Sequence, residues 1–369
     1  MSALLDSLPA MYRDLLPSFF RGEVPPETKA TCSNCAMSEA GCQGKVESVD
    51  GASRLFRPDT KCCTYHPRLP NFLVGALLSD DSPAMAEGRG RVEAKLATRS
   101  GVTPQWVKPS AKYNLLYRSA RGAFGRSASL LCPYFVAEGG NCSIWAYREA
   151  VCSTYFCKYV SGADGRKFWM TVKTYLSLTE IQLSRWVALQ LMPEYVLSGK
   201  DKAESAGEIL TPEDLDGEAP PEAEYRALWG AWAGREAEFY RACHERVRAL
   251  TPAAFERILG FDGDVELALL ERLHRAAFRP ELPPVLKLNP AATVQWLPDG
   301  SVALGCYSEV DALALPGAAY PLLTEFTGKE PVATVRERLR REKQADLFED
   351  VLLELHRHRI LVVPEPVSS

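Results

Sequence analysis

The sequence contains no apolar run of about 20 residues, the length that a transmembrane helix needs. Residues 1–20 lack both a basic start and a continuous apolar stretch, so they do not predict a secretory signal. Neither sign of charge dominates, because 43 Lys and Arg stand against 47 Asp and Glu. The net charge of −4 gives no general attraction to nucleic acid or to an anionic membrane. We therefore expect a cytoplasmic protein whose partner is neither a membrane nor a nucleic acid.

Histidine is also scarce, with five in 369 residues, and four of the five lie beyond Cys157. None belongs to a zinc-protease or nucleophile-elbow motif. The glycines of residues 88–90 and 122–125 do not follow a strand in a dinucleotide-binding pattern, so they predict no phosphate loop. These absences exclude the common catalytic motifs.

The length exceeds that of one compact core and predicts two or three domains. We expect an α+β, mostly α fold, in which a loop-rich cysteine-cluster domain with long helices precedes a C-terminal winged-helix-like domain. The predicted parts are a cysteine-cluster domain (1–197), an acidic linker (198–221), a helical segment (222–284) and the winged-helix-like domain (285–366).

Apolar periodicity predicts the helices, and Pro298-Asp299-Gly300 predicts a hairpin turn between strands at 292–297 and 301–306. A third short strand is expected at 312–315 and a last one at 359–363. The expected helices are 1–20, 83–97, 143–155, 167–191, 222–250, a further helix after Thr251-Pro252, one more marked by Leu267, Leu270 and Leu273, and then 318–327, 332–343 and 347–358.

Cysteine is the residue that the chain concentrates, since 9 of its 11 cysteines fall between Cys32 and Cys157. In a reducing compartment such clustering favours metal or redox chemistry over disulfides. A Cys-x-x-Cys turn directs two thiolates at one point, which suits tetrahedral zinc or one face of an iron–sulfur cluster. The first group is Cys32, Cys35, Cys42, Cys62 and Cys63, and the second is Cys132, Cys142, Cys152 and Cys157.

Other readings of these residues stay open. Free cysteines are often buried as small apolar residues, which we expect of Cys243 and Cys306. A disulfide framework is a further alternative, and His66 is either a metal ligand or a hydrogen-bonding residue.

Arg148 and Cys152 are spaced to share one helix face, where the arginine would lower the pKa of the thiol. Nearby aromatic residues predict a dry shell around the centre, or alternatively a substrate pocket. They are Trp145, Tyr147, Tyr155, Phe156 and Trp169.

The order Cys-x-x-Cys, Cys-Cys, Cys-Pro-Tyr-Phe, Cys-Ser-Ile-Trp, Arg-Glu and Cys resembles that of the YkgJ-type cysteine-cluster proteins, described as zinc- or iron-chelating. Flagellin lysine N-methylases carry a related pattern, with a proposed iron–sulfur role. The resemblance spans residues 30–165 and implies an iron–sulfur (4Fe-4S) cluster or Zn²⁺. It departs from the family in the long insertion between Cys35 and Cys62, which contains Cys42. The implied metal ligands are Cys32, Cys35, Cys62, Cys63, Cys132, Cys142, Cys152 and Cys157.

Residues 285–366 resemble the PqqD-like peptide-recognition domain, through the hairpin at Asp299-Gly300, the run Leu313-Ala-Leu-Pro-Gly317 and the apolar pattern of the last helix. The resemblance implies a peptide or protein partner that adds as a strand beside the hairpin. Winged-helix DNA binding is the alternative, because residues 336–343 form a basic helix. However, 9 Lys and Arg stand against 12 Asp and Glu over residues 285–369, which argues against it.

Two functions follow as hypotheses. In the first, a metal or iron–sulfur centre modifies a peptide or protein delivered by the C-terminal domain, methylase-like by analogy. In the second, the protein is not catalytic, and zinc staples a loop-rich domain used for interaction or metal handling.

Overall fold

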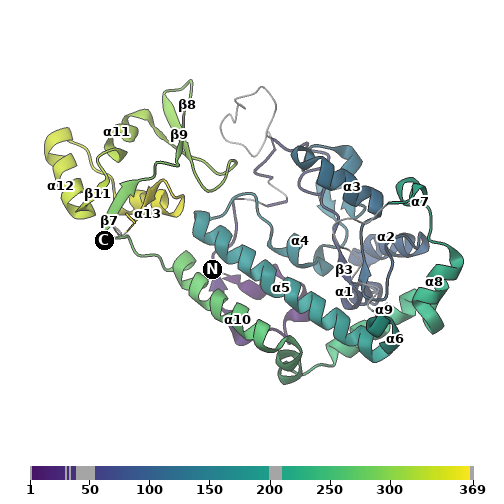
Figure 1. The fold of residues 1–369 in the computed structure, drawn as a ribbon. Helices are drawn as coiled ribbons and strands as arrows, with labels where there is room; N and C mark the ends of the chain where they lie inside the picture. The colour runs from purple at the N-terminus through teal and green to yellow at the C-terminus, as the bar shows by residue number, and fades with distance from the viewer. Residues whose placement is uncertain (1, 30, 33–34, 39–54, 199–209, 366–369) are drawn as a thin grey trace. The chain divides into compact units, whose positions relative to one another are not determined.

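The computed structural model describes residues 2–29, 31–32, 35–38, 55–198 and 210–365. It is 54% helix and 11% strand, and its small sheets are antiparallel, so the predicted α+β, mostly α fold is confirmed. Two compact units make up the chain (Figure 1). Unit 1 contains Met1–Val24, Cys32–Tyr155 and Thr171–Ala268, and unit 2 contains Pro25–Thr31, Phe156–Met170 and Leu269–Ser369. Residues 199–209 of the predicted linker lie outside the described residues.

The centre of unit 1 is α1 (Asn71–Leu78), a helix whose eight residues are all buried. It is apolar on every side, as expected of a helix that neighbours surround. It packs on α9 (Glu236–Arg248) in Figure 1, where Gly75 allows the closest approach. A Cβ atom at Gly75 would lie 1.8 Å from the carbonyl oxygen of Tyr240, so no larger residue fits there.

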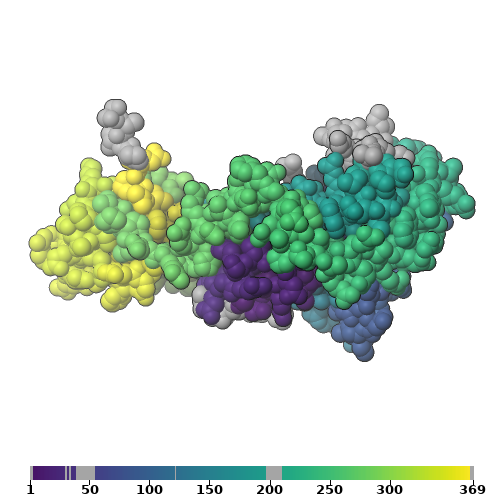
Figure 2. Space-filling view, turned by 90° about the horizontal axis from the view of Figure 1, so that it is seen from below, coloured from purple at the N-terminus to yellow at the C-terminus, as the bar shows by residue number. Residues whose placement is uncertain are grey.

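The N-terminal segment does not form the predicted amphipathic helix. Pro9 and Pro17 each precede a new 3₁₀ turn, because proline disrupts the helical hydrogen-bond pattern. The resulting segment, purple in Figure 2, reaches the surface on the face shown there. Its elements are β1 (Ser2–Ala3), η1 (Leu4–Ser7), η2 (Ala10–Tyr12), η3 (Ser18–Arg21) and β2 (Glu23–Val24), with β1 paired to β2.

The other helices follow the predicted periods with three differences. The helix expected at 318–327 ends at Leu323, and a strand begins at Thr327. The helix expected at 222–250 is two helices, α8 (Glu222–Trp229) and α9, because Gly230 and Gly234 adopt positive φ between them. The segment expected as a helix at 143–155 is mostly irregular and ends in α4 (Ala150–Thr154). The predictions at 83–97 and 167–191 are confirmed by η4 (Pro83–Met85) with α2 (Ala86–Ala97), and by α5 (Gly162–Leu191).

The remaining elements of the first 280 residues are short strands, further helices and 3₁₀ turns. The strand pairs are β3 (Leu69–Pro70) with β4 (Trp106–Val107), and β5 (Phe135–Val136) with β6 (Asn141–Cys142). The helices are α3 (Ala111–Ser119), α6 (Pro193–Ser198), α7 (Pro212–Asp216) and α10 (Pro252–Phe278), which bends at Gly260, where φ is 59°. The 3₁₀ turns are η5 (Arg121–Ala123), η6 (Ala128–Leu130), η7 (Glu138–Gly140), η8 (Trp145–Tyr147) and η10 (Gly230–Trp232).

Unit 2 contains two three-stranded antiparallel sheets, ordered β10-β9-β8 and β11-β7-β12. The predicted hairpin is confirmed, since β8 (Thr293–Trp296) pairs with β9 (Ser301–Gly305). The remaining strands are β7 (Val285–Leu288), β10 (Leu313–Pro316), β11 (Thr327–Pro331) and β12 (Leu361–Val362). The helices are η11 (Gly317–Ala319), α11 (Tyr320–Leu323), α12 (Val332–Lys343) and α13 (Glu349–Arg357).

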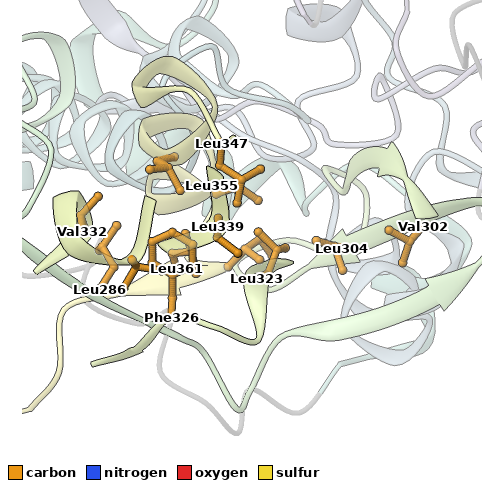
Figure 3. Packing of buried hydrophobic residues seen from close by; sticks show 13 residues of the cluster. Leu286, Val302, Leu304, Leu323, Phe326, Val332, Leu339, Leu347, Leu355 and Leu361 are labelled. Carbon is orange, nitrogen blue, oxygen red and sulfur yellow. The ribbon is translucent and has the colours of Figure 1, made fainter. Parts of the chain in front are cut away.

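The core of unit 2 is a cluster of thirteen buried apolar side chains. Figure 3 shows Leu286 from β7, Leu339 from α12 and Leu361 from β12 among them, together with Phe326, which directly precedes β11. Segments distant in sequence join this unit through Glu27, whose carboxylate accepts hydrogen bonds from the backbone N–H of Val160 and from the indole N–H of Trp169, each at 2.7 Å.

Within the described ranges, none of the helices combines the length and the apolar character that crossing a membrane demands.

Candidate metal centre

Cys35, the second cysteine of the Cys-x-x-Cys motif, begins a tight turn that ends at Ser38. The carbonyl oxygen of Cys35 accepts hydrogen bonds from the backbone N–H of Ser38 at 3.0 Å and from its hydroxyl at 2.7 Å. Ala36 and Met37 are buried beside it. The sulfur of Cys35 accepts a hydrogen bond from the backbone N–H of Met37, two residues further on. Cys42 lies outside the described residues.

The Cys62-Cys63 pair sits in a turn fixed by buried threonines. The Thr60 hydroxyl donates to the carbonyl oxygen of Gly125 at 2.9 Å, and the Thr64 hydroxyl accepts from the Gly125 N–H at 2.7 Å. The carbonyl oxygen of Cys63 accepts the backbone N–H of Cys132 at 2.8 Å. That bond joins the first cysteine group to the second.

The second group is built on the short β5–β6 ladder. Cys142 pairs with Phe135, and Gly139 and Gly140 form the turn between the strands with φ of 77° and 60°. The sulfur of Cys132 accepts the N–H of Tyr134, and that of Cys142 accepts the N–H of Ile144. Cys35, Cys132 and Cys142 thus share one local geometry, a sulfur facing the amide two residues ahead.

Two cations lie among these thiols. The Lys61 ammonium donates to the carbonyl oxygens of Cys32 and Gly140, both at 2.8 Å, so it ties the first group to the β5–β6 turn. The Arg148 guanidinium lies 3.3 Å from the ring centroid of Trp145 and donates to the carbonyl oxygens of Trp145 and Cys152. Within the described residues neither cation forms an ion pair with a carboxylate.

Burial and mutual repulsion disfavour thiolates at this place, whereas the cations favour them. Burial raises the pKa of Cys132 to about 12 and raises that of Cys32 and Cys142. The Cys62 pKa is raised first by its hydrogen bond with Cys63 and then by burial. Arg148 acts in the opposite direction on Cys32 and Cys142, because a nearby positive charge stabilises a thiolate.

Cys152 is oriented by two buried carboxylates. Glu149 caps α4, accepting the N–H groups of Val151 at 2.7 Å and Cys152 at 3.0 Å. Glu180, from α5, accepts the N–H of Ala150 at 2.7 Å and the Tyr12 hydroxyl at 3.3 Å. Both glutamates are 4% exposed, and burial raises the pKa of each. Three successive N–H groups of α4 are therefore held by two carboxylates.

Six of the eight predicted ligands lie in unit 1 close enough to one another to interact electrostatically. They are Cys32, Cys35, Cys62, Cys132, Cys142 and Cys152. Interactions link Cys62 to Cys32, Cys35, Cys132 and Cys142, and link Cys152 to Cys132 and Cys142. Cys63 joins them through the backbone and through its contact with Cys62. Cys157 belongs to unit 2.

The disulfide alternative and the roles expected of Cys243, Cys306 and His66 can be compared with the structure. All described cysteines are free thiols. Cys243 is fully buried on α9, whereas Cys306 is partly buried against the unit 2 core. His66 stacks on Tyr113 with ring centroids 3.6 Å apart and hydrogen-bonds the carbonyl oxygen of Leu131 at 2.8 Å. Burial lowers its pKa to about 4.

As the side chains stand, the described residues contain no group of three or more His, Cys, Asp or Glu side chains that could hold a metal ion. The donor chemistry nevertheless fits a thiophilic metal: several thiols interact electrostatically with one another, backbone amides face three of the sulfurs, and Lys61 and Arg148 have no carboxylate partner among the described residues.

Sequence reasoning missed Lys61, Glu149, Glu180 and Tyr12. Glu180 carried a usable signal, because it lies on the same face of α5 as the buried residues Leu176, Leu183 and Val187. A carboxylate on an apolar helix face indicates a buried partner.

The basic helix of the DNA-binding alternative is α12. Its cations all pair with carboxylates, for example Arg336 with Asp346 at 3.1 Å, Arg338 with Glu330 at 2.5 Å and Lys343 with Glu325 at 3.1 Å. Arg340 and Arg341 are also paired. The positive charges of α12 therefore form ion pairs with carboxylates of unit 2.

Comparison of the chain with family models, curated proteins and solved structures finds no match.

Proposed function

We propose that this protein holds a thiolate-ligated metal centre, an iron–sulfur cluster such as 4Fe-4S or Zn²⁺, in unit 1. The ligands are drawn from Cys32, Cys35, Cys62, Cys132, Cys142 and Cys152, with Cys63 and Cys157 as the further candidates from the resemblance. The alternative of a non-catalytic protein stapled by zinc shares this centre and differs in the metal.

One observation carries the proposal: the partly buried Arg148 lies among thiols, and within the described residues its hydrogen-bond partners are carbonyl oxygens. Arg148 interacts electrostatically with Cys152, Cys142, Cys32 and Cys62, and the described residues give it no carboxylate. An unpaired buried charge is costly, so a buried cation requires an anion nearby. Thiolates on a metal, whose combined charge is negative, would supply that anion.

The amides that face Cys35, Cys132 and Cys142 support the same conclusion. Hydrogen bonds from backbone N–H groups stabilise a sulfur that carries negative charge and tune a cluster that it ligates. A thiol turns about its Cα–Cβ bond between staggered positions at low cost. The proposal therefore requires that the cysteine side chains rotate to complete a ligand set.

The test is anaerobic purification of the full chain followed by analysis of iron, zinc and acid-labile sulfide. An iron–sulfur cluster predicts a brown protein with iron and sulfide in similar amounts, and Zn²⁺ predicts a colourless protein with stoichiometric zinc. Cys142→Ser should lower the bound metal, whereas Cys306→Ser, in the unit 2 core, should not. A wild-type protein without iron or zinc, or equal loss in both variants, would overturn the proposal.

We propose as a second function that unit 2 binds a peptide along β8, the function that the PqqD-like resemblance implies. All residues of β8 are exposed, and Trp296 is 58% exposed. Leu297 donates its N–H to Ser301 across the hairpin, so the alternation of an antiparallel ladder turns the N–H groups of Val294 and Trp296 to the outer edge. An edge of this kind can accept a further strand.

Selection of a phage-displayed random peptide library on the full-length protein would test this second function. Val294→Pro removes one outward N–H and leaves the hairpin bonds intact, so it should abolish capture of the enriched peptides. Val294→Thr is the matched control and should retain capture. Capture that survives Val294→Pro would contradict binding at this edge.

A further inference from the structure

A wide, open pocket of about 480 Å³ lies in unit 2, and no residue of β8 lines it. We call it the cavity below. Three parts of this unit form its walls. They are the last turns of α10 with the residues that follow (Arg275, Ala276, Arg279, Pro280 and Glu281), the first turn of α5 (Asp164), and the end of α13 with its following turn (His356 and Arg359).

The walls concentrate positive charge. Arg359 forms an ion pair with Asp164, whereas Arg275 and Arg279 have no carboxylate partner among the described residues. Three guanidinium groups against the carboxylates of Asp164 and Glu281 leave one net positive charge. An excess of arginine in a concave site indicates an anionic ligand.

The placement of Arg275 and Arg279 supports a ligand common to both. Arg275 is in the last turn of α10, and Arg279 follows directly after the helix, with its backbone N–H bonded to the carbonyl oxygen of Arg275 at 3.0 Å. This spacing of four residues places both on one side of the helix end, where two like charges repel each other. The helix dipole favours basic residues in a last turn and partly offsets this repulsion. It does not explain why Arg359, from a separate element, borders the same cavity.

Arg359 is held firmly in position. Its φ is 61°, a left-handed conformation that costs free energy in a residue with a side chain. Its N–H donates to the carbonyl oxygen of His356 at 2.9 Å, and its guanidinium binds Asp164. His356 is fixed as well, since its Nδ1 donates to the carbonyl oxygen of Leu361 at 3.0 Å.

We propose that this cavity binds a small organic phosphate, with Arg275 and Arg279 on the phosphoryl oxygens and Arg359 as a fixed wall. Each guanidinium fork donates two parallel N–H bonds and carries one positive charge. The three terminal oxygens and nearly double negative charge of a phosphate monoester match two such forks better than the single charge of one carboxylate does. The cavity has the size of small-molecule sites and exceeds a bare phosphate, so the rest of the ligand fills the remaining space.

The experiment is isothermal titration calorimetry on the full chain near physiological ionic strength, which screens contacts between distant surface charges. The probes are glucose 6-phosphate and AMP as organic phosphates, inorganic phosphate, and citrate as a carboxylate. We expect the organic phosphates to bind more tightly than inorganic phosphate, and citrate to bind weakest. Tighter binding of citrate, or no binding of either organic phosphate at millimolar concentration, would overturn the proposal.

Arg275→Gln and Arg279→Gln should each weaken binding about tenfold, which corresponds to one charge-assisted hydrogen bond. Arg272→Gln is the matched control, because Arg272 is exposed on the same helix and does not line the cavity. Equal weakening in all three variants would show a diffuse charge effect and contradict the site. Both target arginines are exposed, so unchanged thermal midpoints should accompany the loss of binding.

Discussion

The cysteine turns of unit 1 (residues 32, 35–38, 57–65 and 131–154) and the core of unit 2 are held together by different interactions. The turns rely on directional bonds: Lys61 and Arg148 bind carbonyl oxygens, and buried carboxylates hold α4. The unit 2 core relies on thirteen buried apolar side chains. Directional bonds specify a geometry but add little net stability, whereas apolar burial adds most of it. The comparison predicts that only the cysteine turns depend on a metal.

Metal removal should give the largest effect. A structural metal site contributes on the order of 10 kcal/mol to folding, so a chelator with a reductant should unfold the cysteine turns. Hydrogen-exchange mass spectrometry should show lost protection at residues 57–65 and 131–154. Peptides from residues 285–365 are the internal control and should stay protected. Equal loss in both regions would contradict the comparison.

Phe326→Ala should destabilise the unit 2 core by about 3–5 kcal/mol, the usual cost of deleting a buried aromatic side chain. The measurement is the denaturation midpoint of the full chain, with metal content determined in parallel. Phe348→Ala is the matched control, because Phe348 is 64% exposed, and it should change the midpoint little. If Phe326→Ala lost metal at temperatures where the protein stays folded, the metal would depend on the unit 2 core, and the difference between the two regions would be contradicted.

Glu180→Ala should cost about 1–3 kcal/mol, because it leaves the N–H of Ala150 and the hydroxyl of Tyr12 buried without an acceptor. Faster hydrogen exchange should appear at residues 150–154, which carry Cys152. Glu180→Gln retains one acceptor oxygen and should restore most of the protection. Unchanged exchange in Glu180→Ala would show that α4 does not depend on this carboxylate.

The smallest effect, about 1 kcal/mol, is expected from Asp346→Asn in the partly exposed arginine network of unit 2. The hydrogen bond from Arg336 lowers the pKa of Asp346 below its usual value. This carboxylate therefore contributes stability above about pH 4 that is lost as the pH falls through its lowered pKa. Asp346→Asn should reduce the acid dependence of the denaturation midpoint. Glu342→Gln should not, because Glu342 is exposed and its ion pair is with its sequence neighbour Arg341.

Regular helices and the hairpin could be predicted because their signals are local. The apolar period locates α5, and the predicted helix at 332–343 matches α12 residue for residue. The Asp299-Gly300 turn fixes the hairpin, because Gly300 adopts a φ of 80° there. The helix predicted at the N-terminus is wrong: the apolar spacing there is typical of a helix, but Pro9 and Pro17 divide the segment into separate 3₁₀ turns.

The sequence by itself determined which thiols are available and where the helices and the hairpin lie, since spacing and turn residues act over a few positions. Only the tertiary structure decided which groups surround those thiols. Tyr12 and Glu180 meet although 168 residues separate them, and Asp164 meets Arg359 across 195. Such contacts depend on how whole elements pack, and a single sequence without its fold carries no local signal for them.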